Sequence, residues 1–166
     1  SMFSLNGEGI LMSRENTQGI LVRAYLKKDL DKIELLEKGI IDGSLNEFEE
    51  NTISIGKDLA ISLDLVAGEE VTLISSANIT TIFGNVPTQQ SFKISSIFTS
   101  GLAEFDQNVI FMPIESALQF FDVSEEENSL EIFLNKPEDI EIAKTKIQKI
   151  FSDYYVYSWA DLNKSF

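Results

Sequence analysis

The sequence predicts an α+β domain built on a mixed sheet, and three observations lead to this prediction. Short apolar runs rich in β-branched and aromatic residues recur along the 166-residue chain. Stretches with the apolar spacing of an amphipathic helix separate several of these runs, so strands and helices partly alternate. With 43% apolar residues, 3 Pro and 9 Gly, the chain can bury a core, which argues against a disordered or fibrous protein.

Segments of mostly apolar or alternating residues predict the strands. The first expected strand meets a polar turn at 13–16, and the last is a tyrosine-rich segment close to the end of the chain. The expected strands cover residues 3–12, 19–25, 52–56, 71–74, 91–98, 109–112, 130–134 and 154–157.

Four helices are expected between these strands. Asp31 is expected to cap a short helix that ends at Gly39, because glycine tolerates the positive φ common at helix C-termini. Pro113 suits the first position of another helix. The helix that Pro113 begins is expected at 114–121. The remaining expectations are a short helix through Leu59, Ala60 and Leu63, a helix at 138–151, and a loop at 101–108.

Composition argues against several classes of function. The chain has no His and no Cys, so it lacks the commonest acid–base residue, thiolate nucleophiles, disulfides and the usual zinc ligands. Its net charge of −14 opposes binding to nucleic acid and to anionic lipid. No apolar run approaches the length of a membrane span, so we expect the chain as given to be soluble. Ser1 directly before Met2 is typical of a remnant of tag cleavage.

The most unusual feature of the sequence is a long segment without charge. Residues 71–92 contain no charged side chain, where a chain that is 24% charged would carry about five in this length. In its central part, 78–90, Gly84-Asn85 is typical of a hairpin turn, and Pro87 is expected to interrupt strand pairing because it donates no backbone hydrogen bond. The sequence therefore predicts a loop or ribbon that protrudes between two strands.

Two interpretations of this segment remain open. Exposed Ile82, Phe83 and Val86 without neighbouring charges would have the composition of a binding surface, since charged residues are depleted in the cores of interfaces. Alternatively, the three side chains fold back onto the core, as apolar residues in loops commonly do.

Other candidate sites have weaker support. Glu104 and Asp106 are a candidate carboxylate pair, but no partner residue type supports acid–base catalysis, and two carboxylates in one turn are ordinary. The acidic run 125–127 lacks the ligand spacing of a calcium site. The serine pairs 75–76 and 95–96 have no base in their pattern, and the glycines match neither common phosphate-binding loop.

A set of segments, taken in order and spacing, carries a resemblance to a known family. The segments are 19–23, 55–60 with 63 and 68–71, 81–87, 92–98 with 101–106, and Trp159 with Asn163 and Phe166. Together they make residues 19–166 similar to the extracytoplasmic domain of the LolC and LolE membrane subunits of the bacterial lipoprotein-releasing ABC transporter. These subunits belong to the MacB-like permease superfamily.

The resemblance implies a MacB-like periplasmic domain inserted between the first two transmembrane helices of an inner-membrane permease subunit. Residues 3–166 would then form a single domain of two intertwined subdomains, which lacks the family's usual first strand and helix. Such transporters pair with a second LolC/LolE-type subunit and use separate LolD-type ATPase subunits to lift lipoprotein cargo from the membrane and pass it to the soluble carrier LolA. The domain itself would be no enzyme and would need no cofactor or metal.

In LolC-type subunits a protruding β-hairpin, the hook, docks the carrier. The residues that the resemblance assigns to the hook are Ile82, Phe83, Gly84, Asn85, Val86, Pro87, Thr88, Gln89 and Gln90. The sequence departs from the LolC pattern because Gln90 stands where an arginine is usual, so a charge-assisted contact is lost there. Segment 101–106 is closer to LolE-type or hybrid subunits, and the type of subunit stays open.

Two alternatives to a carrier-docking domain remain. A MacB-like or FtsX-like permease that binds an efflux adaptor or a cell-wall hydrolase regulator fits the same resemblance. An enzyme would require a titrating group in a cleft, and the sequence supports it least.

Overall fold

The structure, a computed structural model, describes residues 2–14, 16–81, 84–123, 129–134, 136–158 and 161. The chain divides into two compact units, Ser1–Glu131 and Ile132–Phe166. None of the helices in this described part is long and apolar enough to cross a membrane. That residues 3–166 act as one domain stays a prediction.

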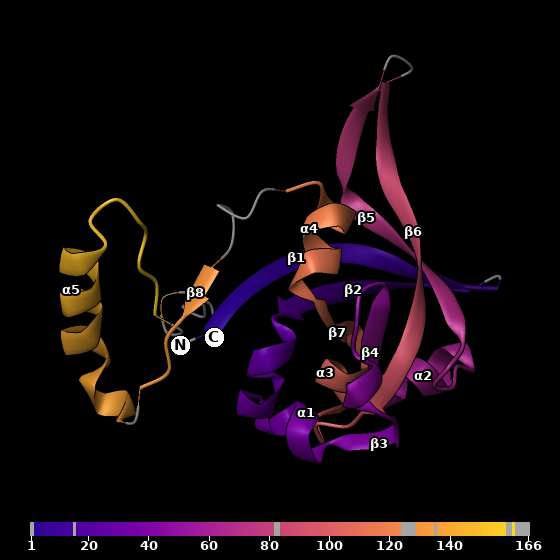
Figure 1. Cartoon of the computed structure of the whole chain (residues 1–166), viewed down its shortest axis with the longest axis horizontal. Coiled ribbons are helices and arrows are strands. Elements are labelled where there is room, and N and C mark those ends of the chain that lie inside the picture. The colour runs from indigo at the N-terminus through magenta and orange to yellow at the C-terminus, as the bar shows by residue number, and fades with distance from the viewer. Residues whose placement is uncertain are drawn as a thin grey trace. The chain divides into compact units, whose positions relative to one another are not determined.

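Six strands of the first unit pair into a closed ring. Strand β1 pairs with β2, β2 with β7, β7 with β4, β4 with β6, β6 with β5, and β5 again with β1. The β2–β7 and β4–β6 pairs are parallel and the others antiparallel, so the sheet is mixed, as predicted. Two short strands lie outside the ring, β3 on β6 and β8 on β1 (Figure 1). The bounds are β1 Met2–Ser13, β2 Asn16–Tyr25, β3 Ile40–Gly43, β4 Thr52–Gly56, β5 Glu70–Thr81, β6 Gly84–Phe98, β7 Val109–Pro113 and β8 Ser129–Glu131.

Strand β7 shows how the ring is packed on both faces. Ile110 and Met112 belong to one hydrophobic cluster, and the alternating residues Val109 and Phe111 belong to a second. A strand buried on both faces has no polar–apolar alternation. This explains why the sequence has an unbroken apolar run at this position.

Helices cover these two clusters. Helix α4 contacts five strands of the ring and buries Ala117 and Phe120 in the first cluster, which also receives Leu59 from α2. Helices η1 and α1 bury Leu30 and Leu36 in the second cluster. The helices described in this unit are η1 Lys27–Lys32, α1 Glu34–Lys38, η2 Leu45–Glu47, α2 Lys57–Leu63, α3 Ala103–Asn108 and α4 Ile114–Phe121.

The second unit contains η4 (Pro137–Asp139), α5 (Ile140–Ile150) and a return segment. Helix α5 confirms the helix predicted at 138–151, but its apolar stripe is only half-buried, and Ile150 is 74% exposed. The side chain of Gln148 donates to the carbonyl oxygen of Tyr154 at 2.9 Å. Polar contacts therefore hold the return segment to the helix.

Most of the predicted elements are confirmed, several with longer bounds. The strands expected at 3–12, 19–25, 52–56, 71–74, 91–98 and 109–112 are β1, β2, β4, β5, β6 and β7. The helices expected through Leu59 and at 114–121 are α2 and α4. Pro113 is the last residue of β7 and the N-cap of α4, one position before the predicted place.

The predicted helix after Asp31 is wrong in its start and in the role of its final glycine. Asp31 lies inside η1, and α1 starts after Ile33 without a side-chain cap. Gly39 has an ordinary φ of −94°. A Cβ there would lie 2.3 Å from the carbonyl oxygen of Leu35, so close backbone approach, rather than positive φ, requires glycine.

Three further local predictions are wrong in whole or in part. The loop expected at 101–108 is largely helix α3, which no side chain caps and which packs Phe105 against the second cluster. The strand expected at 154–157 is irregular, and the one at 130–134 is limited to β8. Tyr155 and Tyr157 stack at 6.2 Å, but no described strand pairs with this segment, and an unpaired strand is not stabilised by propensity alone.

Gly56, the last residue of β4, allows α3 to approach closely. A Cβ on Gly56 would lie 2.0 Å from the backbone oxygen of Asp106, a clash that no side-chain rotation relieves. We therefore expect Gly56→Ala to lower the free energy of unfolding by about 1–3 kcal/mol, measured by urea unfolding. Gly19→Ala in β2 is the matched control, because its Cβ meets no atom within 4 Å. Equal losses in both variants would contradict this contact.

Tyr25 is a buried phenol at the end of β2. Its side chain is 2% exposed, and its hydroxyl donates to Glu131 of β8 at 3.3 Å. Burial, reinforced by the negative charge of Glu131, raises the pKa of Tyr25 to about 12. The folded chain therefore binds this proton more tightly than the unfolded chain, in which a phenol has a pKa of about 10.

The sign of this shift predicts alkaline destabilisation. The contribution of Tyr25 is fully present below about pH 10 and is lost as the pH rises toward 12, because the unfolded phenol then releases its proton first. We expect a loss of about 2–3 kcal/mol over this range. Urea unfolding at a series of alkaline pH values should show that Tyr25→Phe lacks this part of the pH dependence. An unchanged alkaline decline in the variant would refute the assignment.

Candidate functional site

The candidate site is the part of the β5–β6 hairpin that extends beyond the ring. Strand β1 pairs with β5 only up to Ser75, and β4 pairs with β6 only from Lys93 onward. Between these limits β5 and β6 pair only with each other, up to Thr81 and Gly84 (Figure 1). We call residues 76–81 and 84–88 the ribbon. At about 3.3 Å per residue, the strand from Ser75 to Thr81 spans about 20 Å.

The uncharged segment of the sequence coincides with this hairpin. Its flanking charges are Glu70 and Lys93, which occupy directly paired positions on β5 and β6. Lys93 also lies 3.4 Å from the carboxylate of Glu47. The charges therefore mark the base of the hairpin, and every residue beyond them is neutral.

Polar contacts fix the base of the ribbon to the body. The pairing shifts between Ile74 and Asn78, where β5 has more residues than β6, and such a bulge bends a strand pair. In this bulge the hydroxyl of Ser76 donates to the carbonyl oxygen of Glu8 at 2.8 Å. The point at which the ribbon leaves the ring is therefore held to β1 by this hydrogen bond.

Asn51 provides the second attachment. Its side-chain oxygen accepts from Gln90 at 2.6 Å, and its backbone oxygen accepts from the Lys93 amide at 3.0 Å. Its own amide donates to Ser116 of α4 at 3.0 Å. Gln90, which the sequence assigned to recognition, is half-buried and bonded to the body, so in this structure it supports the hairpin base.

The predicted contact residues occupy different positions. Val86 is 48% exposed, and Pro87 and Gln89 are also exposed, whereas Thr88 is half-buried. Ile82 and Phe83 lie outside the described residues, and only the backbone is described for Gly84 and Asn85. The alternative in which Val86 folds back onto the core is therefore not observed.

Two local predictions about the hairpin are wrong. Gly84 and Asn85 were expected to form the turn but lie in β6, paired with Thr81 and Thr80. Pro87 was expected to interrupt the ladder but pairs with Asn78. Residues of an antiparallel ladder alternate between hydrogen-bonded and non-hydrogen-bonded pairs, and only the second kind needs no amide. A proline can occupy a pair of the second kind without loss of a ladder bond, which accounts for Pro87 within the ladder.

The two candidate carboxylates, Asp106 and Glu104, lie in different environments. Asp106 is 2% exposed, and its carboxylate accepts from the Thr99 hydroxyl at 2.8 Å and from the Ser100 amide at 2.8 Å. Glu104 is exposed, so the two carboxylates do not form a pair. Asp106 instead fixes the turn before α3. Residues 125–127 and Trp159 lie outside the described part of the chain.

The serine candidates are also structural. The hydroxyl of Ser95 donates to the carbonyl oxygen of Ile53 at 3.1 Å, and the buried hydroxyls of Ser96 and Ser54 are bonded to each other at 2.8 Å. These contacts link β6 to β4 inside the ring. They leave these hydroxyls in the sheet rather than in a cleft.

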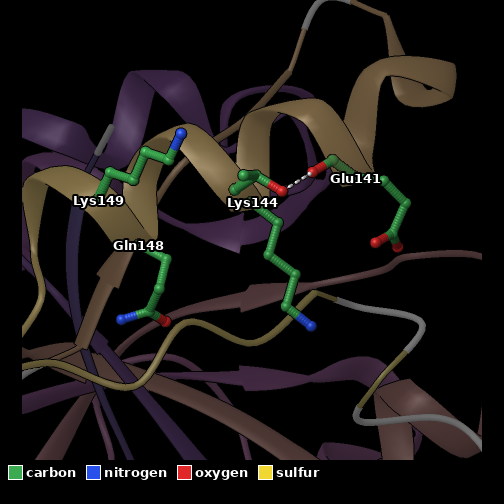
Figure 2. A pocket seen from close by; sticks show the side chains of 5 residues that line it. Glu141, Lys144, Gln148 and Lys149 are labelled. Atoms are coloured by element: carbon green, nitrogen blue, oxygen red, sulfur yellow. Dashed lines mark hydrogen bonds between the residues drawn. The ribbon is translucent and has the colours of Figure 1, made fainter.

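Figure 2 shows a shallow hollow along α5 in the second unit. Its lining residues, Glu141, Lys144, Thr145, Gln148 and Lys149, all come from this helix. Thr145 donates to the carbonyl oxygen of Glu141 at 2.9 Å, and Lys144 is paired with Asp161, whose hydrogen bond raises the pKa of Lys144. This hollow contains solvated charges rather than converging catalytic groups.

The role of Asp106 can be tested through stability. Asp106→Asn replaces a carboxylate oxygen that accepts hydrogen bonds with an NH₂ group that cannot. We expect the free energy of unfolding to fall by about 1–3 kcal/mol. Glu104→Gln, an equivalent change on an exposed side chain of the same helix, should have little effect. Thermal melting of both variants checks this, and comparable losses would refute the structural role of Asp106.

Comparisons with known proteins agree with the resemblance. No protein-family model matches the chain. The chain is 28% identical over 107 residues to the lipoprotein-releasing system transmembrane protein LolC of Xylella fastidiosa strain 9a5c. It is 27% identical over 107 residues to LolC of strain Temecula1 / ATCC 700964. Each match covers 63% of this chain and 26% of the LolC protein, so the chain spans about a quarter of these relatives.

A solved structure shares the fold. The chain matches the extracellular domain of the noncanonic ABC-type transporter YknZ from Gram-positive bacteria with a TM-score of 0.62, covering 92% of this chain and 73% of that one. At 14% sequence identity this likeness shows the fold alone. The predicted α+β, MacB-like fold and the resemblance to LolC-type permease subunits are therefore confirmed.

Proposed function

We propose that the chain is the periplasmic domain of an inner-membrane ABC permease subunit of the lipoprotein-releasing type, and that its ribbon docks a LolA-type lipoprotein carrier. The observation that carries this proposal is the neutral, paired ribbon that extends beyond the ring with Val86 exposed. The similarity to LolC over 107 residues supports the choice of transporter. Cargo lipoproteins, a second LolC/LolE-type subunit and LolD-type ATPase subunits would complete the machine.

The charge distribution supports docking by the ribbon. The whole chain carries a net charge of −14, but residues 71–92 carry none. A neutral surface loses less hydration energy than a charged one when a partner covers it, because buried charges must be compensated. The ribbon is therefore a surface that a partner can cover without desolvating charged side chains.

The anchoring of the ribbon supports a mechanical role. The contacts of Ser76 with Glu8 and of Gln90 with Asn51 hold its base on the ring. Movements of the ring would therefore be transmitted directly to a partner bound to the ribbon. ATP hydrolysis would belong to separate cytoplasmic subunits, and this domain would pass their motion to the carrier.

Val86 offers the sharpest test of carrier docking. Val86→Asp places a charge in the neutral ribbon, and we expect carrier affinity to fall at least about tenfold because the carboxylate would be desolvated in the interface. Val66→Asp is the matched control, since Val66 is 57% exposed and lies outside the hairpin. Isothermal titration with purified LolA-type carrier measures both affinities, and circular dichroism checks the fold. Equal affinities of the two variants would disprove docking through the ribbon.

A second candidate is a permease domain with another partner. The likeness to the YknZ extracellular domain shows the fold alone, and both candidate functions use this fold. It therefore supports the second candidate as much as the first. Titrating the chain against the carrier, an efflux adaptor and a cell-wall hydrolase regulator separates the two. Binding to one of the latter two but not to the carrier would favour the second candidate.

A further inference from the structure

The ribbon has two outer edges that carry no strand among the described residues. On one side, β5 has left β1 after Ser75, and on the other, β6 has not yet reached β4 before Lys93. Each outer edge therefore presents backbone amide and carbonyl groups that the ring does not use. Such edges are templates for pairing with another strand.

Pro87 indicates which backbone groups face outward. Because Pro87 has no amide to donate, its pair with Asn78 is assigned to the non-hydrogen-bonded kind, which needs none. By alternation, the pair of Thr80 with Asn85 is of the same kind, and the pair of Thr81 with Gly84 is hydrogen-bonded. A hydrogen-bonded pair of residues three apart is also what closes a two-residue hairpin connection.

The two edges are therefore chemically different. Along β5, Asn78 and Thr80 direct both their N–H and C=O groups outward at a two-residue spacing. Along β6 the corresponding residues are Asn85 and Pro87, and Pro87 offers no N–H group. Proteins commonly protect edge strands with proline or charged residues. Here proline protects β6, while β5 beyond Glu70 has neither proline nor charge.

We infer that the free edge of β5 at 78–81 receives an extended strand of the partner through backbone hydrogen bonds. This inference rests on the proposed function and specifies its docking mode. The occupant is a neutral or basic, proline-free strand of the carrier, because an acidic strand would be repelled by a body with a net charge of −14. The same repulsion disfavours a second copy of this chain on that edge.

Two proline variants of one residue pair test the edge. Thr80→Pro removes an outward N–H group from β5, and Asn85→Pro removes the outward N–H group of the paired residue on β6. Neither change removes a bond between the strands, and Pro87 shows that the ladder accepts proline at such a pair. Protection of the Ile79 and Thr81 amides from hydrogen exchange reports whether the hairpin remains paired in each variant.

The readouts are carrier affinity and amide exchange, both measured with this chain and purified LolA-type carrier. We expect Thr80→Pro to weaken binding about tenfold and Asn85→Pro to change it less than about threefold. In the wild-type complex, the amides of Asn78 and Thr80 should gain protection that they lack in the free chain. The wild-type measurement needs no variant and applies even where a variant fails to pair.

The outcomes separate this inference from the proposed function. No binding of the wild-type chain to the carrier overturns both. Binding without added protection at Asn78 and Thr80, or with equal effects of the two variants, overturns the edge inference and leaves docking by the ribbon intact. Sedimentation that shows a wild-type dimer, dissociated by Thr80→Pro, assigns the edge to a second copy and also overturns it.

Discussion

Strand β6 is the element on which the rest of the structure depends. Its C-terminal half pairs with β4 and β3, and its N-terminal half pairs only with β5. Lys93 is the point of change, because it is paired with Thr52 of β4 on one side and with Glu70 of β5 on the other. One continuous strand thus belongs to both the ring and the ribbon. A two-stranded hairpin alone is only marginally stable in water, so the ribbon owes its order to this continuity.

The distribution of charge follows the same division. Charged side chains flank the hairpin at its base, where ion pairs such as Lys93 with Glu47 accommodate them. The ribbon has none. A neutral surface carries a cost in solubility, and contact with a partner is a role that would offset this cost.

The sequence predicted elements whose signal is local. Regular spacing predicted α4 and α5, and apolar runs predicted the strands of the ring. Elements set by distant contacts were missed: α3 forms because Gly56 lets it approach β4 and because the Asp106 carboxylate closes its preceding turn. The strand predicted for the tyrosine-rich segment 154–157 is wrong for the opposite reason. Its residues have strong strand propensity, but no described strand pairs with them.

The hairpin shows the same limit at the candidate site. The missing charges predicted its position, but Pro87 was expected to end the ladder because proline lacks an amide. The register keeps Pro87 inside the ladder, and a non-hydrogen-bonded pair is the position that needs no amide. That assignment leaves the backbone groups of Asn78 and Thr80 on the outer edge of β5, which no side-chain pattern could reveal.

At its position in the ladder, Pro87 therefore has two effects on the ribbon. Pro87 keeps the pair with Asn78 intact, and it closes the outer edge of β6 to another strand. Because neither outer edge of the ribbon carries a strand among the described residues, blocking one edge leaves an asymmetric surface. A partner that pairs along β5 would meet the ribbon in one orientation, and side chains such as Val86 would then add contact area to a geometry that the backbone has already selected.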